Sequence, residues 1–275
     1  MAKVFSRLDA DHGTRFPGRS PLSSGPAERI SQIPTRTPPA IFEKLYASCV
    51  SGDIHRFREI LDSQSVSLES SDICDFSAIM IEAIKLDGVQ FIQELLTRGL
   101  PMDPLYALEA VRVKGKDALG GNEEMAAWLL DHGADPNSPC VVDLTPLSLA
   151  VETAPISVVQ LMLSRGGDAR KGQLLHHAAE RQSDNIAIFS PLIENGADID
   201  STLYENHHPS RALFCFLALG TTLHEAAELG KVDVVRYLVS EGANVGFKDA
   251  TGRTALEWAQ MLNQGEVVQV LEKRN

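Results

Sequence analysis

A glycine recurs about every 33 residues along this chain, and each one follows the same pattern of apolar residues. The glycines are Gly99, Gly133, Gly166, Gly196 and Gly242, with separations of 34, 33, 30 and 46 residues. The residues eight, seven, four and three positions before each glycine are apolar in all twenty cases. Such a stripe followed by glycine predicts an amphipathic helix that ends in a left-handed residue. The chain is thereby constrained to fold as a row of similar units.

A shorter, alanine-rich segment comes before this helix in several units. Copies of it begin at Thr145, Gln173, Thr221 and Thr254. A threonine in this place caps a helix N-terminus by accepting a backbone hydrogen bond, and alanines in the middle let neighbouring helices approach closely. A pair of such helices cannot bury its apolar stripe alone. We therefore expect stacked pairs that share one continuous core.

These residues closely resemble the ankyrin repeat, whose unit of about 33 residues starts with Thr-Pro-Leu-His and exits through Gly-Ala-Asp. The stretch Thr221–Val245, TTLHEAAELGKVDVVRYLVSEGANV, matches this pattern at nearly every position. The resemblance implies an all-α solenoid of stacked helix pairs with hairpin-loop tips over residues 41–275. Seven units fit this range, and the first (Ile41–Asp72) and last (Thr251–Asn275) are degenerate.

Residues 1–40 differ in composition from the rest of the chain. They hold six of the 14 prolines and a net charge of +3, which leaves −15 on the other 235 residues. Prolines remove backbone hydrogen-bond donors, and few large apolar side chains are present to offset the entropy of ordering. We expect a disordered N-terminal tail ahead of the repeat domain.

Two insertions, at residues 113–122 and 200–220, interrupt the repeat spacing. The second contains the apolar run Ala212–Leu219, which is unusual for a surface loop. It either folds back on the stack as an extra helix or forms an exposed docking surface. Pro191 falls inside a predicted second helix, where we expect it to cause a kink.

Motifs for catalysis or cofactor binding are missing from the sequence. There is no P-loop, no Gly-x-Ser-x-Gly, no His-Glu-x-x-His and no Gly-x-Gly-x-x-Gly. The resemblance implies that His176 and His224 hydrogen-bond the adjacent turn of the repeat. We therefore expect no catalytic residue, no metal and no cofactor. Five potential zinc ligands lie within 40 residues but lack a metal-binding spacing: His176, His177, His207, His208 and Cys215.

Composition narrows the classes of partner. A net charge of −12 disfavours nucleic acid as the main ligand. The longest apolar run has eight residues, well below the ~18 needed to cross a bilayer. Four cysteines without paired spacing suit reduced thiols, so we expect a cytoplasmic or nuclear protein.

Stacked repeats line up their inner helices and loop tips into one concave face, which is suited to binding. We expect a non-enzymatic protein-protein interaction scaffold or adaptor that binds a partner protein through this face. The acidic repeat domain favours a partner with a basic segment. The expected partner-binding residues are Tyr106, Asn137, Arg170, Lys171, Arg181, Tyr204, Lys248 and Arg253.

Two alternatives stay open. One is an enzyme, or an accessory to a metabolic enzyme, with a small-molecule site near residues 200–220 and Glu205, His207 or His208 as acid or base. A closed pocket beneath the insertion favours this alternative, and an open groove favours the scaffold. The other is a substrate receptor of a ubiquitin ligase, although no recognisable partner-binding box stands in residues 1–40 or after Leu271.

Overall fold

The structure is a computed structural model that describes residues 37–63, 73–112, 123–139, 143–182, 186–215 and 217–274. The chain divides into two units, residues 1–36 and residues 37–275. Almost all of the expected tail and the whole 113–122 insertion lie outside the described residues.

The described residues form fifteen helices and no strand, which confirms the all-α prediction. Fourteen of the helices make seven pairs, one for each predicted unit, and α13 (His208–Leu213) lies in the second insertion. The first helices of the pairs are α3 (Pro39–Ser51), α5 (Ile73–Lys85), α7 (Pro104–Arg112), α9 (Pro146–Thr153), α11 (Leu174–Glu180), α14 (Thr222–Glu228) and α16 (Ala255–Met261). The second helices are α4 (Ile54–Ser63), α6 (Val89–Thr97), α8 (Glu123–Asp131), α10 (Ile156–Ser164), α12 (Phe189–Glu194), α15 (Val232–Ser240) and α17 (Gly265–Glu272).

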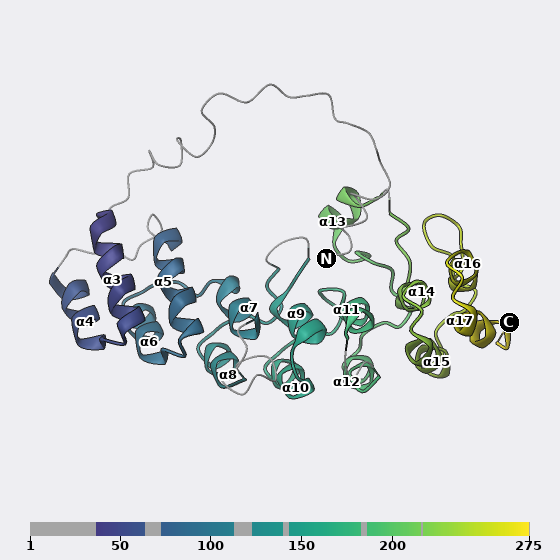
Figure 1. Cartoon of the computed structure of the whole chain (residues 1–275), viewed down its shortest axis with the longest axis horizontal. Helices are drawn as coiled ribbons and strands as arrows, with labels where there is room; N and C mark the ends of the chain where they lie inside the picture. The colour runs from purple at the N-terminus through teal and green to yellow at the C-terminus, as the bar shows by residue number, and fades with distance from the viewer. Residues whose placement is uncertain are drawn as a thin grey trace, which may run out of the picture. The chain divides into compact units, whose positions relative to one another are not determined.

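The helices of the second unit form two layers, which can be followed in Figure 1. Each first helix packs against the first helix of the next pair, without a break from α3 to α16. Second helices also pack on one another, as α4 does on α6, α8 on α10 and α15 on α17. The apolar stripe of every pair is therefore covered by its neighbours, as in a solenoid.

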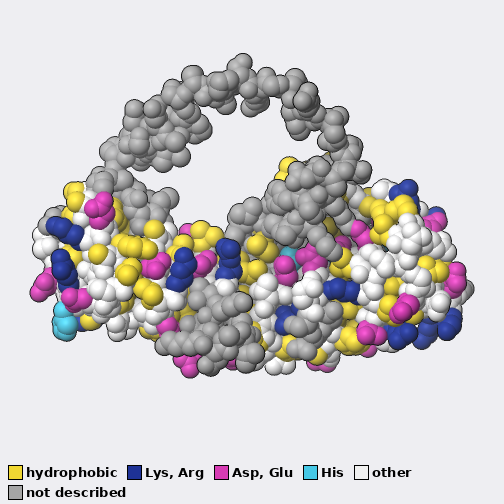
Figure 2. All heavy atoms as spheres, in the orientation of Figure 1, with side chains coloured by type: hydrophobic (Ala, Val, Ile, Leu, Met, Phe, Trp, Pro, Cys, Tyr) yellow, Lys and Arg dark blue, Asp and Glu magenta, His cyan; other side chains and the backbone are white. Residues whose placement is uncertain are grey.

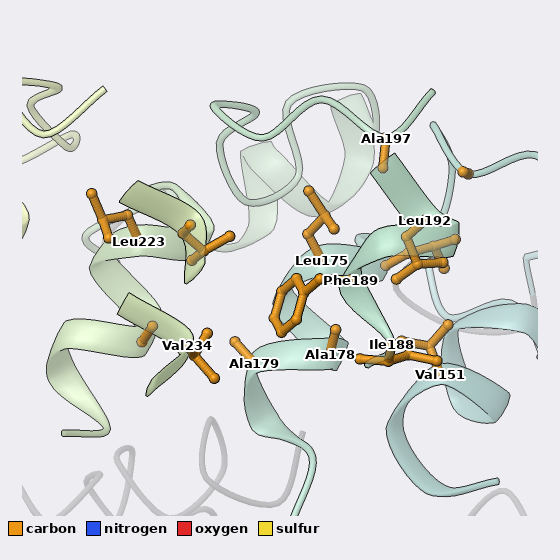
Figure 3. Close-up of a cluster of buried hydrophobic side chains, with 14 of the residues drawn as sticks. Val151, Leu175, Ala178, Ala179, Ile188, Phe189, Leu192, Ala197, Leu223 and Val234 are labelled. Atoms are coloured by element: carbon orange, nitrogen blue, oxygen red, sulfur yellow. The ribbon is translucent and has the colours of Figure 1, made fainter. Parts of the chain in front are cut away.

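The repeated stripe behaves as the sequence predicts. In each of the five units, three of its four residues are buried and the fourth is half-buried. The five glycines that follow all have φ between 94° and 98°, the left-handed conformation that ends the helix. Figure 3 shows one region of this core, where Phe189 from α12 points toward Leu175 and Ala179 of α11.

Capping boxes start three of the first helices, each built around a threonine. The threonine side chain accepts a hydrogen bond from the backbone N–H of the residue three positions on, and the side chain of that residue accepts one from the threonine N–H. The threonines are Thr145, Thr221 and Thr254. Ser148, His224 and Glu257 fill this position in turn. Three chemically different side chains thus satisfy the same backbone donor, the N–H of the capping threonine.

Side chains near the start of the first helices also tie each repeat to the next. Ser148 donates to the Gly172 carbonyl at 2.6 Å, and His176 Nε2 lies 3.1 Å from the Gly220 carbonyl. His224 Nδ1 accepts from the Thr221 N–H, so its Nε2 carries the proton that is donated to the Arg253 carbonyl at 3.1 Å. Both histidines therefore bond the adjacent turn, as the resemblance implies.

The predicted kink at Pro191 is wrong. Helix α12 begins only at Phe189, so Pro191 is its third residue. Proline is tolerated in the first turn because the backbone N–H groups there have no partner within the helix.

The second insertion folds back on the stack with a helix, but this helix lies at other residues than expected. The helix spans His208–Leu213 rather than the apolar run, and its N-terminus is capped by His207 Nδ1, which accepts from the Ser210 N–H. A bridge between Thr202 and Thr221 brings the two ends of the insertion together. Leu219 is buried, whereas Leu213 is 60% exposed.

Candidate partner-binding surface

The first helices carry a regular surface because each of five of them holds a buried pair of small or aliphatic residues. The residue directly before this pair and the residue directly after it lie on the opposite side of the helix and are all partly or fully exposed. We call these ten positions the inner-helix face. They are Glu82 and Lys85 on α5, Glu109 and Arg112 on α7, Leu149 and Glu152 on α9, His177 and Glu180 on α11, and Glu225 and Glu228 on α14.

Charges on the N-terminal part of this face are balanced within each helix. Lys85 Nζ lies 4.0 Å from a Glu82 oxygen, and an Arg112 nitrogen lies 3.8 Å from a Glu109 oxygen. Such exposed pairs contribute little to stability, but each one neutralises its own carboxylate. This part of the surface therefore carries little net charge.

On α9, α11 and α14 the same positions carry acids without a lysine or arginine among them. We call Glu152, His177, Glu180, Glu225 and Glu228 the acidic face. All five side chains are half-buried, which holds their charges against the protein and partly away from water. In Figure 2, acidic side chains gather over the region of α9 and α11, while Lys and Arg side chains lie over α5 and α7.

His177 is placed between two of these acids. Its Nδ1 lies 3.1 Å from a Glu152 oxygen across the repeat boundary and 4.0 Å from a Glu180 oxygen on its own helix. The hydrogen bond with His177 lowers the pKa of Glu152, against the effect of burial. Glu152 is therefore held in its charged form.

The second insertion adjoins the acidic face through Tyr204. The Tyr204 N–H donates to the Gln173 side-chain oxygen at 2.9 Å, and its ring stacks on Phe214 with centroids 5.3 Å apart. Burial, followed by the charges of Glu180, Asp143 and Glu225, raises the pKa of Tyr204. Its phenol thus forms an uncharged edge of this negative surface.

Three of the residues expected to contact a partner are buried, so their predicted exposure is wrong. Leu105 and Leu147 each follow a proline at the start of a helix, but the buried pair Ala110-Val111 comes five residues after Leu105, whereas Ala150-Val151 comes three residues after Leu147. This difference of two residues turns Leu105 outward and leaves Tyr106 fully buried. Arg181 is 5% exposed because its guanidinium donates to the carbonyls of Val151 and Ala154 at the end of α9. Tyr204 is 7% exposed through its packing on Phe214.

The other five expected contacts lie near the hairpin tips. Asn137 spans two tips, since it donates to the Gly166 carbonyl and accepts from the Asp168 N–H. The remaining four are exposed and basic, and Arg170 pairs with Asp168. The structure brings these four to the tips but not to the acidic face: Arg170, Lys171, Lys248 and Arg253.

None of the residues of the acidic face is among those that the sequence predicts to contact a partner. The signal that reveals this face is the buried pair, which reads Ala-Val on α9 and Ala-Ala on α11 and α14. Residues flanking such a pair share one face of the stack, so their charges add up across repeats.

The acid-base candidates of the insertion have structural roles or lie in solvent. Glu205 accepts from the Thr202 N–H, His207 caps α13, and His208 is exposed. A partly open cavity of about 220 Å³ lies against the insertion, and Arg170, His176, Asp198 and Asn206 are among its lining residues. Burial lowers the pKa of His176 to about 4, so this histidine is neutral near pH 7.

Of the two described cysteines, Cys49 is buried and Cys215 is exposed. Cys49 and Cys215 are both free thiols. Burial, and then the charge of Glu82, raises the pKa of the Cys49 thiol to about 11. That thiol is therefore protonated and unreactive at neutral pH. Among the described helices, none is both long and apolar enough to cross a membrane.

Comparisons with known proteins agree with this architecture. Residues 116–203 and 204–275 match the family profile "Ankyrin repeats (3 copies)". Similar proteins include "Ankyrin repeat, SAM and basic leucine zipper domain-containing protein 1" of Dasypus novemcinctus, 29% identical over 152 residues, which are 52% of this chain and 31% of that protein. Its counterpart in Loxodonta africana is 30% identical over 132 residues, 47% of this chain and 27% of that protein. A "Transient receptor potential cation channel subfamily A member 1 homolog" of Caenorhabditis elegans is 24% identical over 142 residues, 52% of this chain and 8% of that protein. The chain thus spans less than a third of each relative.

Proposed function

Because this chain belongs to the ankyrin-repeat family, whose repeats generally serve as protein-protein interaction modules, we propose that it is a non-enzymatic adaptor. Its acidic face binds a basic segment of a partner protein. The observation that carries this proposal is the row of four glutamates on α9, α11 and α14, with no lysine or arginine at the equivalent positions. The free thiols of Cys49 and Cys215 suit a reducing compartment, cytoplasmic or nuclear.

Charge and rigidity both favour this use of the surface. The glutamates project from helices that pack on one another over a buried core, so little order has to be gained on binding. Half-buried carboxylates attract a cation more strongly than fully solvated ones, because water screens them less. The four exposed cations at the hairpin tips, Arg170, Lys171, Lys248 and Arg253, are proposed to contact acidic groups that flank the basic segment.

The test uses labelled peptides of equal length, one rich in Lys and Arg and one rich in Asp and Glu. Fluorescence anisotropy with the full chain should show saturable binding of the basic peptide alone, weakened by salt. The double variant Glu225→Lys with Glu228→Lys should reduce that affinity at least about tenfold. The matched control, Glu59→Lys with Glu241→Lys, makes the same change of net charge at two exposed positions, one on α4 and one at the C-cap of α15.

Two results would contradict the proposal. One is equal weakening by the control pair, which would mean that only the overall charge of the molecule attracts the peptide. The other is equal binding of both peptides by the unaltered chain. Circular dichroism of every variant checks that the helices are retained.

A further inference from the structure

Three groups that commonly ligate metals meet where α9 packs on α11. They are a Glu152 oxygen, His177 Nδ1 and a Glu180 oxygen, and all three atoms lie within 4.8 Å of one another. We propose that this cluster is a binding site for a divalent ion of the zinc type, one that accepts both imidazole and carboxylate ligands.

The distances suit a tetrahedral ion. Zinc bonds of about 2.1 Å place neighbouring ligand atoms about 3.4 Å apart. The His177 nitrogen lies 3.1 Å from the Glu152 oxygen and 4.0 Å from the Glu180 oxygen. All three atoms lie within 4.8 Å of one another, so binding requires the two glutamate side chains to rotate and bring their oxygens about 1 Å closer together. The ion would take the place of the hydrogen bond between His177 Nδ1 and the Glu152 carboxylate.

The backbone around the cluster is held in place by packing and hydrogen bonds. Val151, next to Glu152, and Ala178, next to His177, are both fully buried in the shared core. Arg181 bonds the carbonyls at the end of α9 and so fixes this helix against α11. The three ligands therefore come from two helices whose relative position is set before any ion binds.

The ligand set also selects the class of metal. One imidazole and two carboxylates suit zinc and related transition metals, whereas Mg²⁺ and Ca²⁺ prefer six or more oxygen ligands. The side chains of Glu152, His177 and Glu180 are 30%, 13% and 23% exposed, so solvent reaches the cluster. A water molecule or a partner side chain can then complete the coordination.

The experiment is calorimetric titration of the chelator-treated full chain with ZnCl₂, and separately with MgCl₂. We expect one equivalent of zinc to bind in the micromolar range or tighter, and magnesium to bind at least about a hundredfold more weakly. His177→Gln and Glu152→Gln should each weaken zinc binding at least about tenfold. His55→Gln, which alters an exposed histidine on α4, is the matched control and should bind as the unaltered chain does.

Three outcomes would overturn the site. They are no saturable zinc binding at concentrations up to about 100 µM, unchanged zinc affinity in His177→Gln and Glu152→Gln, or equal affinity for zinc and magnesium. Circular dichroism shows whether each variant keeps its helices. The site shares Glu152, His177 and Glu180 with the acidic face, but its test is separate, since zinc is titrated without any partner present and the peptide test alters only Glu225 and Glu228.

Discussion

Lys231 Nζ lies 2.6 Å from the backbone carbonyl oxygen of Arg181, and the Arg181 guanidinium in turn bonds two carbonyls of the preceding repeat. Each of these two cations thus donates hydrogen bonds to carbonyls at the C-terminal end of the first helix in the preceding repeat. Gln264 repeats the arrangement with a neutral side chain, since its amide donates to the Glu228 carbonyl at 3.1 Å. The last carbonyls of α9, α11 and α14 thus obtain donors from the following repeat.

This arrangement links the stability of neighbouring repeats. A helix C-terminus leaves carbonyls without partners inside the helix, and a buried carbonyl without any partner is costly. A long cationic side chain fills this need and also places a positive charge at the negative end of the helix dipole. Removing one such side chain should therefore weaken two repeats together.

The first prediction concerns Arg181→Met, which keeps a flexible unbranched stem but removes the guanidinium and its donors. The carbonyls of Val151 and Ala154 would lose their bonds, so the free energy of unfolding should fall by about 1–3 kcal/mol. Urea unfolding followed by circular dichroism measures this change. Arg236→Met, at an exposed position on α15, should change stability by less than about 0.5 kcal/mol. Equal effects of the two substitutions would contradict the capping role.

The second prediction concerns the pH dependence of stability through His176. Its pKa is about 4 in the folded chain because of burial, below the 6.5 of an unperturbed histidine. The unfolded state therefore binds more protons between these values, and stability is lost as pH falls from about 6.5 toward 4. The difference corresponds to about 3 kcal/mol at most.

His176→Gln isolates this contribution, because glutamine keeps a donor for the Gly220 carbonyl but does not titrate. Unfolding free energies measured at several pH values from 7 to 4.5 should fall less steeply for this variant than for the unaltered chain. His55→Gln, at an exposed site, should leave the slope as it is. Parallel slopes for the unaltered chain and His176→Gln would show that His176 does not contribute.

The third prediction tests the core of one repeat. Leu238 on α15 is fully buried, so Leu238→Ala should leave a cavity and lower the unfolding free energy by about 2–5 kcal/mol. Ser240→Ala, on the exposed end of the same helix, should have an effect below about 0.5 kcal/mol. Thermal melting of the two variants side by side makes the comparison. A loss below about 1 kcal/mol for Leu238→Ala would mean that this layer repacks around the gap.

The sequence alone predicts the repeat and its helix ends because these depend on local patterns. The glycine at Gly99, for example, follows a stripe in which Phe91, Ile92 and Leu95 are buried, and its φ is 98°. The helix and the left-handed glycine that ends it each depend on only a few neighbouring residues, so a short sequence pattern is enough to identify both.

Surface residues were predicted less well because their exposure depends on register and on distant partners. The buried pair Ala110-Val111 fixes the register of α7 and takes Tyr106 inward, although Leu105 follows a proline just as Leu147 does. Arg181 looks like a charged residue at a helix end, where exposure is usual. Its burial follows from the position of α9, which places the carbonyls of Val151 and Ala154 within hydrogen-bond distance of its guanidinium.

The helix in the second insertion was misplaced for a similar reason. The apolar run from Ala212 suggests a helix there. The helix starts instead at His208, where His207 supplies a cap and Pro209 occupies the first turn. Capping and a favourable first turn determine where a short helix begins, more than hydrophobicity does.

The last prediction asks whether this insertion supports the solenoid. Replacement of Glu205–Ala218 by Gly-Ser-Gly keeps the Thr202–Thr221 bridge and the bond from the Leu203 N–H to the Gly220 carbonyl. It removes the stacking of Phe214 on Tyr204, a loss of about 1 kcal/mol, while the shorter loop recovers about 1 kcal/mol of closure entropy.

These two effects nearly cancel, so the variant should unfold in urea within about 1 kcal/mol of the unaltered chain. Phe214→Ala in the intact insertion is the matched comparison, because it removes the stacking without shortening the loop. It should be the less stable of the two by about 1 kcal/mol. A loss above about 3 kcal/mol in the shortened chain would show instead that the insertion belongs to the folding core, since that exceeds what stacking and loop closure account for. The distinction matters for binding, because an insertion that adds no stability can vary in sequence beside the acidic face without unfolding the repeats that present it.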